Sequence, residues 1–186
     1  AALIRVTDAG LGMTADELPA ALERHATSKL ARDEDLEAIT TLGFRGEALA
    51  AICAVSRFTI TSRARGATDA ARLAGQGGVV AQRLSVPAET GTTVEVRDLF
   101  FNTPARLKFL KSPATELAAS LRVLSQLALA HHATQLRVGN NGRPVLTAPR
   151  AADLRARIGA LWGWDVAERL LAVAREERGV GIAAWL

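Results

Sequence analysis

Four stretches of the chain alternate apolar and polar residues, the spacing typical of a half-buried β-strand. They cover residues 3–6, 58–61, 79–86 and 92–96. Short apolar runs predict two later hairpins, one around the turn sequence Asn140-Asn141-Gly142 and one between residues 170 and 185. Residues 63–78 follow no period, so we expect a loop or a weak strand tip there.

Helical spacing of apolar residues separates these strands. The first helix is predicted to begin with Asp16 as N-cap, because this start places Pro19 in the first turn, where proline is tolerated. Other helices are predicted over residues 47–55, 105–110 and 150–162. The helix over 47–55 is apolar nearly all round, which indicates burial on every side.

The clearest helix begins with Ser112 as N-cap and Pro113 in the first helical position. One stripe of this helix carries Leu117, Leu121, Leu124 and Ala128. His131 and His132 close the helix, where positive charge suits the helix dipole, so we interpret them as a helix end and not as metal ligands. Strands and helices do not alternate regularly, which favours an α+β fold with helices on one face of a mixed, mostly antiparallel sheet.

Composition narrows the class of protein. Hydrophobic residues make up 49% of the chain, which is enough for a packed core, and no apolar run reaches the length of a membrane span. No secretory signal opens the chain, so we expect a cytoplasmic protein. Cys53 is the only cysteine, so no intramolecular disulfide exists, and its apolar surroundings predict a buried, inert thiol. The net charge of +4 is compatible with nucleic-acid binding and equally with an arginine-rich genomic composition.

Glycines frame a candidate phosphate-binding loop. Gly43-Phe44-Arg45-Gly46 runs directly into the apolar helix that starts at Glu47. Unpaired amides at a helix N-terminus attract anions, and glycines remove the Cβ atoms that would keep a phosphate away. Arg45 adds a permanent cation. A plain loop before a helix is the alternative.

A second candidate segment is Asp8-Ala9-Gly10-Leu11-Gly12, which follows the first strand. An ionised carboxylate only accepts hydrogen bonds, so Asp8 is a candidate partner for an exocyclic amine such as that of adenine. The two glycines would let a flat ring lie against the backbone. Thr92, at the start of a later strand, could share this ligand directly or through water. An ordinary Asp-x-Gly turn and an ordinary strand start are the alternatives.

Five segments, taken in order, resemble the N-terminal ATPase region of the MutL family, the DNA mismatch-repair members of the GHKL ATPases. They are Asp-x-Gly-x-Gly at 8–12, Arg24-His25-Ala26-Thr27-Ser28-Lys29, residues 43–49, Gly91-Thr92-Thr93, and Asn102-Thr103-Pro104-Ala105-Arg106 with Lys108-Phe109-Leu110. The resemblance covers essentially the whole chain. The second and third segments are specific to MutL within that superfamily.

The resemblance implies a Bergerat-type fold with ATP in a side pocket and Mg²⁺ beside it. Asp8 would recognise adenine, with Gly10 and Gly12 close to the ring and Thr92 in the same hydrogen-bond network. The nucleotide lid would be lined by Thr27, Ser28 and Lys29. The phosphates would be wrapped by Gly43, Phe44, Arg45, Gly46, Glu47, Ala48 and Leu49. Residues 1–150 would form this ATPase domain, and residues 151–186 would begin a second, transducer-like domain.

One departure from the family affects catalysis. In the family, the general-base glutamate and the asparagine that binds magnesium precede Asp-x-Gly-x-Gly, and this chain opens just before Asp8. We therefore assign no residue a catalytic or metal-binding role, Glu47 included. We expect this chain to be part of a longer protein that hydrolyses ATP, and this segment to bind nucleotide at best.

The resemblance also implies partners. An ATPase switch of mismatch repair would close its lid on ATP and dimerise through N-terminal and C-terminal regions. It would act with a MutS-type mismatch sensor and with DNA, without sequence specificity, and Arg106 and Lys108 are candidate DNA contacts. Two alternatives stay open, a topoisomerase ATPase subunit of the same fold and a non-enzymatic interaction module whose glycines are turns.

Overall fold

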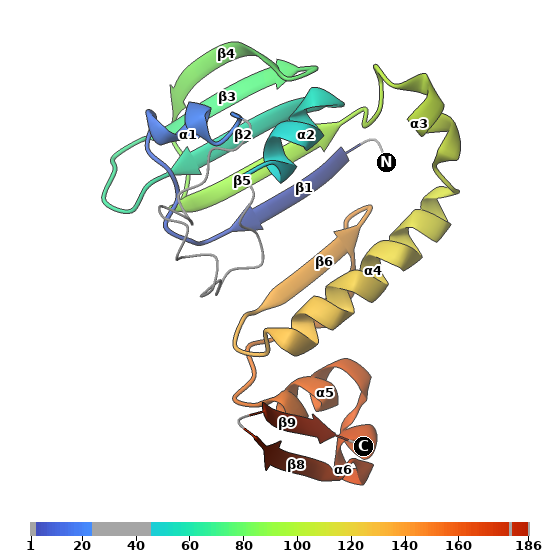
Figure 1. Ribbon diagram of the computed structural model, residues 1–186. Helices are drawn as coiled ribbons and strands as arrows, with labels where there is room; N and C mark the ends of the chain where they lie inside the picture. Colours follow the sequence, from blue (N-terminus) through green and yellow to red (C-terminus); the bar gives the residue numbers. More distant parts are fainter. Residues whose placement is uncertain (1–2, 24–45, 179, 186) are drawn as a thin grey trace. The chain divides into compact units, whose positions relative to one another are not determined.

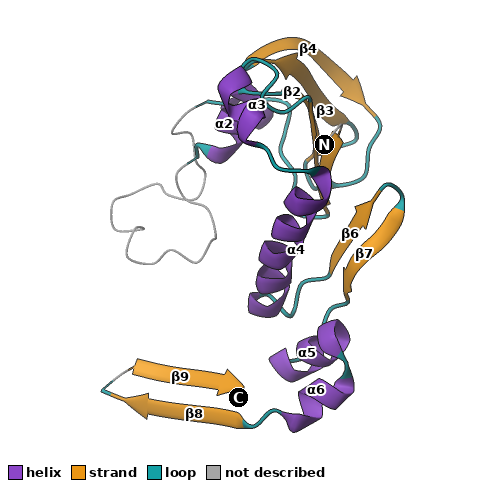
Figure 2. Cartoon of the chain, turned by 90° about the vertical axis from the view of Figure 1, so that its right-hand side faces the viewer, coloured by secondary structure: helices purple, strands orange, loops and turns teal. Residues whose placement is uncertain are grey.

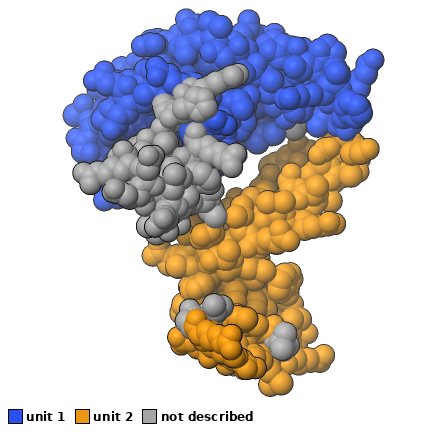
Figure 3. All heavy atoms as spheres, viewed as in Figure 1, with its two compact units in different colours: residues 1–110 blue, residues 111–186 orange. Residues whose placement is uncertain are grey.

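The computed structural model describes residues 3–23, 46–178 and 180–185. Contacts divide the chain into two compact units, Ala1–Leu110 and Lys111–Leu186 (Figure 3). This division does not test the predicted domain boundary at residue 150, which stays a prediction.

The first unit is built on a five-stranded sheet (Figure 1). Its strands are β1 (Leu3–Asp8), β2 (Arg57–Arg63), β3 (Ala70–Gln76), β4 (Val79–Val86) and β5 (Gly91–Arg97). The spatial order is β1-β5-β2-β3-β4, so the last strand of the unit lies between the first two. The pairings between these strands are antiparallel, in agreement with the predicted α+β class.

Two short helices, α1 (Glu17–Ala20) and α2 (Ala48–Ala54), lie on one face of this sheet (Figure 1), and α2 is also labelled in Figure 2. Leu18 from α1 and Cys53 from α2 are almost fully buried. They pack against Phe58 and Ile60 of β2 and Leu73 of β3. Alternate residues of a strand point to the same face, so the predicted alternation of β2 supplies the sheet side of this core.

Reciprocal hydrogen bonds between Thr14 and Glu17 hold the chain at the start of α1. Asp16 is the N-cap, as predicted, but its side chain makes no cap hydrogen bond. Instead, the Glu17 carboxylate accepts a hydrogen bond from the Thr14 amide at 2.8 Å, and the Thr14 hydroxyl accepts one from the Glu17 amide at 3.2 Å. Hydrogen bonding of the Glu17 carboxylate to the Thr14 amide, which has the larger effect, and to the Thr14 side chain lowers the pKa of Glu17. They anchor the chain where it leaves the Asp8–Gly12 segment.

Two predictions for the first unit are wrong. Residues 63–78 contain the strand β3, because hydrogen bonding to both β2 and β4 compensates for a weak alternation pattern. The helix α2 is not buried on every side: Ala50 and Cys53 are buried, whereas Ile52 is 40% exposed. Apolar composition alone does not identify which side of a short helix meets the sheet.

The first unit ends with α3 (Pro104–Phe109), close to the range predicted for it. The second unit begins with α4 (Pro113–Ala130), whose N-cap Ser112 accepts a hydrogen bond from the Thr115 amide at 3.2 Å. After α4 come the paired strands β6 (Leu136–Asn140) and β7 (Arg143–Ala148). Asn141 and Gly142 both have positive φ, at 49° and 77°, which is the two-residue turn that the sequence predicts.

The rest of the second unit consists of α5 (Leu154–Trp162), α6 (Trp164–Arg169), β8 (Ala172–Glu177) and β9 (Val180–Trp185). The predicted start of α5 near residue 150 is too early, because the Asp153 carboxylate accepts a hydrogen bond from the Ala156 amide at 2.7 Å and caps the helix there. The helix α6 was not predicted. The strands β8 and β9 form the predicted second hairpin.

The end of α4 is tied to α5 by a buried cation. Arg157 is fully buried and donates from Nη2 to the carbonyls of His132 at 2.6 Å and Thr134 at 2.5 Å. These carbonyls follow the negative end of the α4 dipole, which favours a positive charge. His131 is the C-cap of α4, so the interpretation of this histidine as a helix end is confirmed.

None of the helices in the described part of the chain is long and apolar enough to cross a membrane.

The core can be tested at its centre. Ile60→Ala is expected to lower the free energy of unfolding by roughly 2–5 kcal/mol, because it opens a cavity at a site with no solvent exposure. Ile52→Ala removes the same atoms from a 40% exposed side chain and is expected to cost about 1 kcal/mol or less. Urea denaturation followed by circular dichroism measures both. Equal losses in the two variants would contradict the described core.

Candidate functional site

Three polar residues form a row across the end of the sheet. Asp8 of β1 pairs with Thr92 of β5, and Thr92 pairs on its other side with Ser62 of β2. Cross-strand partners share a face of a sheet, and Ser62 lies two residues beyond the buried Ile60. The row therefore continues the face that α1 and α2 cover, at the point where apolar side chains give way to polar ones.

The Asp8 carboxylate is positioned by the glycine that follows. Its Oδ1 accepts a hydrogen bond from the Gly10 amide at 2.9 Å, and the side chain is exposed. A Cβ atom at Gly10 would come within 2.9 Å of the same Oδ1, so any larger residue would displace the carboxylate. The predicted neighbours Asp8 and Gly10 are thus brought together, with the carboxylate in an acceptor role.

The role of Gly12 in the structure is backbone packing. Its φ is 68°, and a Cβ atom there would overlap the carbonyl oxygen of Arg63. The adjacent Leu11 carbonyl accepts a hydrogen bond from the Arg65 amide at 2.9 Å. Glycine at position 12 therefore lets the Asp8–Gly12 segment lie against the chain that leaves β2. Proximity of Gly12 to an adenine ring stays a prediction.

Thr92 follows a glycine that is equally constrained. Gly91 has a φ of 119°, and a Cβ atom there would overlap the carbonyl oxygen of Asp8. The start of β5 and the end of β1 therefore approach each other closely, which sets Thr92 beside Asp8. The Thr92 hydroxyl lies 2.9 Å from the hydroxyl of Ser62.

Ser62 was not predicted as part of the site. It is 1% exposed, its hydroxyl accepts a hydrogen bond from the Met13 amide at 2.8 Å, and it donates to the Gly91 carbonyl at 3.2 Å. The signal in the sequence is a serine at the core-facing position that follows Phe58 and Ile60 in the alternation of β2. That signal identifies a buried hydroxyl but not its partners.

The second half of the predicted site lies at the N-terminus of α2. Gly46 has a φ of 62°, Glu47 is the N-cap, and Ala48 and Leu49 begin the helix. The Ala51 amide donates to the Glu47 carbonyl at 2.9 Å, and Leu49 packs against the core. The amides of the first turn precede the first intrahelical donor, so they have no acceptor within the helix itself.

Six predicted site residues lie outside the described residues. They are Thr27, Ser28, Lys29, Gly43, Phe44 and Arg45. Within the described ranges, no group of three or more His, Cys, Asp or Glu side chains is suited to holding a metal ion, so the structure assigns no residue to Mg²⁺.

Cys53 is a structural side chain of the core. It is 1% exposed and is a free thiol, so the prediction of a buried thiol is confirmed. Burial raises its pKa to about 11, which keeps the thiol protonated and unreactive at neutral pH.

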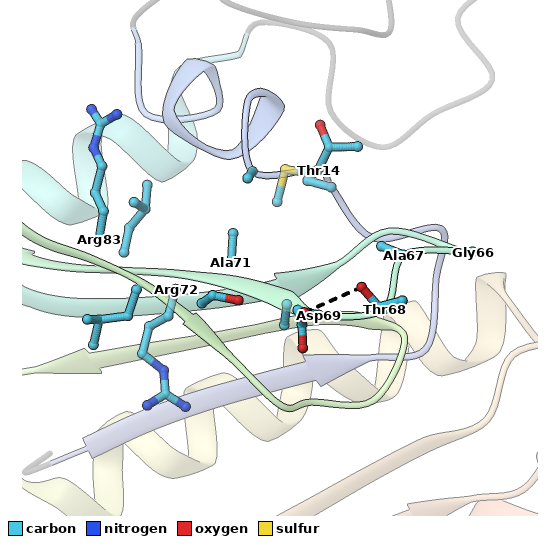
Figure 4. Close-up of a pocket in the computed structure, with 14 residues that line it drawn as sticks. Thr14, Gly66, Ala67, Thr68, Asp69, Ala71, Arg72 and Arg83 are labelled. Carbon is cyan, nitrogen blue, oxygen red and sulfur yellow. Dashed lines mark hydrogen bonds between the residues drawn. The ribbon is translucent and has the colours of Figure 1, made fainter.

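A hollow of about 630 Å³ follows the Asp8–Gly12 segment along the chain, beginning at Met13. It is bounded by residues 13–15, the β2–β3 connection and parts of β3 and β4 (Figure 4). Thr14 and Ala71 lie on the side of the sheet that bears α1, whereas the Arg72 side chain points to the opposite side (Figure 4). Among the described residues, none of those predicted to bind nucleotide lines this hollow.

No protein-family model matches the chain. Curated proteins named DNA mismatch repair protein MutL do match it. The protein from Xanthomonas axonopodis pv. citri is 47% identical over 186 residues, and that from Pseudomonas putida is 45% identical over 188 residues. Each comparison covers 99% of this chain and 30% of the relative, so the chain spans about a third of the length of these relatives.

Solved structures give the same result. The Aquifex aeolicus MutL ATPase domain complexed with ADP superposes with a TM-score of 0.74 at 28% identity, covering 99% of this chain and 64% of that chain. A second structure, of the ATPase domain from the Aquifex aeolicus mismatch repair endonuclease MutL, has a TM-score of 0.68 at 26% identity, covering 99% of this chain and 60% of that chain.

The antiparallel sheet, its helical layer and these structural neighbours place the chain in the class of GHKL ATPase domains. Within that class, the chain belongs to the MutL family of DNA mismatch repair proteins. The family resemblance and the α+β fold predicted from the sequence are both confirmed. The roles of individual site residues stay predictions.

The packing role of Gly12 can be tested against a second glycine. Gly12→Ala and Gly66→Ala both place a side chain at positive φ, which costs roughly 1–2 kcal/mol in each variant. Only Gly12→Ala also forces a Cβ onto the Arg63 carbonyl, whereas Gly66 has open space around it. We expect a clearly larger loss of unfolding free energy for Gly12→Ala by urea denaturation. Equal losses would show that the Asp8–Gly12 segment does not pack as described.

Proposed function

We propose that this chain forms the adenine-binding part of an ATPase. The observation that carries the proposal is the pairing of Asp8 with Thr92 at the end of the sheet. An exposed carboxylate and a hydroxyl lie next to each other on adjacent strands, and both can accept hydrogen bonds from an amino group. The Aquifex aeolicus relative of known structure was solved with ADP, which supports adenine nucleotide as the ligand.

The surrounding backbone is suited to a nucleotide. Gly10 leaves the Asp8 carboxylate in place, and Gly12 holds the segment close to the chain that leaves β2. By family resemblance, an adenine ring would lie beside this backbone. By family resemblance, Gly46 to Leu49 at the start of α2 would contact the phosphates. The lid residues Thr27, Ser28 and Lys29, and Gly43 to Arg45, would complete the site by family resemblance.

ATP hydrolysis is proposed for the intact protein. Mg²⁺ would neutralise charge on the phosphates during phosphoryl transfer. No described residue of this chain is assigned to the metal or to the general base, so we propose that this segment by itself binds nucleotide without turning it over.

The proposed role is an ATP-driven switch in DNA mismatch repair. ATP would order the lid and favour dimerisation, and hydrolysis would reset the protein. The partners proposed on the basis of the MutL relatives are DNA, a MutS-type mismatch sensor and a second copy of the protein. Arg106 and Lys108 lie on the exposed helix α3, where both side chains can reach a phosphate backbone, so they stay our candidates for DNA contact.

The adenine contact is tested by Asp8→Asn. The substitution replaces one acceptor oxygen by a donor NH₂ group and removes the charge, so we expect ADP affinity to fall roughly 10- to 100-fold, the range for a hydrogen bond to a charged group. Isothermal titration calorimetry with ADP measures the change. Asp69→Asn is the matched control, because Asp69 is an exposed aspartate at the hollow and not in the row.

Unchanged ADP affinity in Asp8→Asn, or equal losses in Asp8→Asn and Asp69→Asn, would contradict the proposal. Circular dichroism of each variant checks that the fold is retained.

A further inference from the structure

The hydroxyl of Ser62 has three polar neighbours and capacity for three hydrogen bonds. A serine hydroxyl donates one proton and accepts two. The neighbours are the Met13 amide at 2.8 Å, the Thr92 hydroxyl at 2.9 Å and the Gly91 carbonyl at 3.2 Å. Because Ser62 is 1% exposed, water does not compete freely for these bonds.

Only one arrangement of protons satisfies all three contacts. The Met13 amide can only donate, and the Gly91 carbonyl can only accept. The Ser62 proton therefore goes to Gly91, and the lone pair of Ser62 not used by Met13 accepts the proton of Thr92. If Ser62 instead donated to Thr92, its contact with the Gly91 carbonyl would not be a hydrogen bond.

This arrangement fixes what Thr92 presents to a ligand. Its hydroxyl proton points toward Ser62, so the lone pairs of its oxygen are what remains for a molecule beside Asp8. The Asp8 carboxylate also only accepts. The two neighbouring groups are then both acceptors, which suits a ligand that offers N–H groups at this edge and disfavours one that offers an oxygen.

We infer that Ser62 is a positioning residue for nucleotide recognition, which selects a 6-amino purine by orienting the Thr92 hydroxyl as an acceptor. The inference rests on the proposed function and adds a determinant of base specificity to it. Ser62 acts through Thr92, and through Met13 it also holds the end of the glycine-containing segment. A 6-oxo purine such as hypoxanthine would place its oxygen against these acceptors.

The test compares adenosine diphosphate (ADP) with inosine diphosphate (IDP), which carries an oxygen in place of the amino group. The affinities of both are measured by calorimetry in the intact protein. In Ser62→Ala the Thr92 hydroxyl loses its acceptor, so it can rotate and donate a hydrogen bond to the oxygen of IDP. We expect the preference for ADP over IDP to fall about five- to tenfold, the value of one hydrogen bond.

Ser56→Ala is the matched control. Ser56 is also fully buried and directly precedes β2, at the opposite end of this strand from Ser62. Its hydroxyl donates to the Ile52 carbonyl at 2.7 Å. We expect Ser56→Ala to lower stability while leaving the ratio of ADP to IDP affinity unchanged. A structural role of Ser62 alone would leave that ratio unchanged in Ser62→Ala as well, which would overturn the inference.

A second variant keeps the test decisive if Ser62→Ala folds poorly. Thr92→Val removes the hydroxyl that Ser62 is inferred to orient, so it should lower the same preference for ADP. In the double variant Ser62→Ala/Thr92→Val the preference should fall no further than in Thr92→Val. Additive losses, or a preference that survives Thr92→Val, would overturn the inference.

The outcomes for the two proposals are distinguishable. ADP binding that depends on Asp8 but shows the same base preference with and without Ser62 would overturn only the positioning role. Absence of ADP binding by the intact, unaltered protein would overturn the proposed function and this inference together.

Discussion

The antiparallel pairing of β1 with β5 is the constraint on which the rest of the site depends. It sets Asp8 opposite Thr92, and pairing of β5 with β2 extends the row to Ser62. The register holds because Gly91 permits an approach to the Asp8 carbonyl that no residue with a Cβ could make. A shift of one residue would turn the row onto the opposite face of the sheet.

The same face of the sheet serves two purposes along its length. In the middle, Phe58, Ile60 and Leu73 meet α1 and α2 and bury apolar surface. At the end, the positions in register become Ser62, Thr92 and Asp8, and the face becomes polar. The strands that hold these polar groups are also part of the core. Because the core makes them rigid, the polar groups keep a fixed geometry for recognition.

Short-range signals predicted much of the structure. The alternation around Ile60, the turn at Asn141-Gly142 and the capping role of Ser112 each depend on neighbours in the sequence, and each is found in the structure. The strand β3 was missed because its stability comes from two partner strands and not from its own alternation. For the same reason, no local pattern identified Ser62 as the link between Met13 and Thr92.

The family motifs located the site, and the structure adds reasons for individual residues. From the sequence, Gly12 was predicted to leave space for an adenine ring. In the structure it also packs against the Arg63 carbonyl, and this contact is needed even without a ligand. Such a contact joins segments about fifty residues apart, which spacing along the chain does not reveal. The segments that would complete the lid lie outside the described residues, so their roles stay predictions.

The row of Asp8, Thr92 and Ser62 is proposed to border the adenine pocket, a claim that a two-dimensional amide NMR titration of the protein with ADP can test. We expect the largest resonance shifts at Asp8, Gly10 and Thr92, with little change at Thr68 and Asp69 beside the neighbouring hollow. Large shifts at Thr68 and Asp69 with none along the row would contradict the claim and place the nucleotide in the hollow.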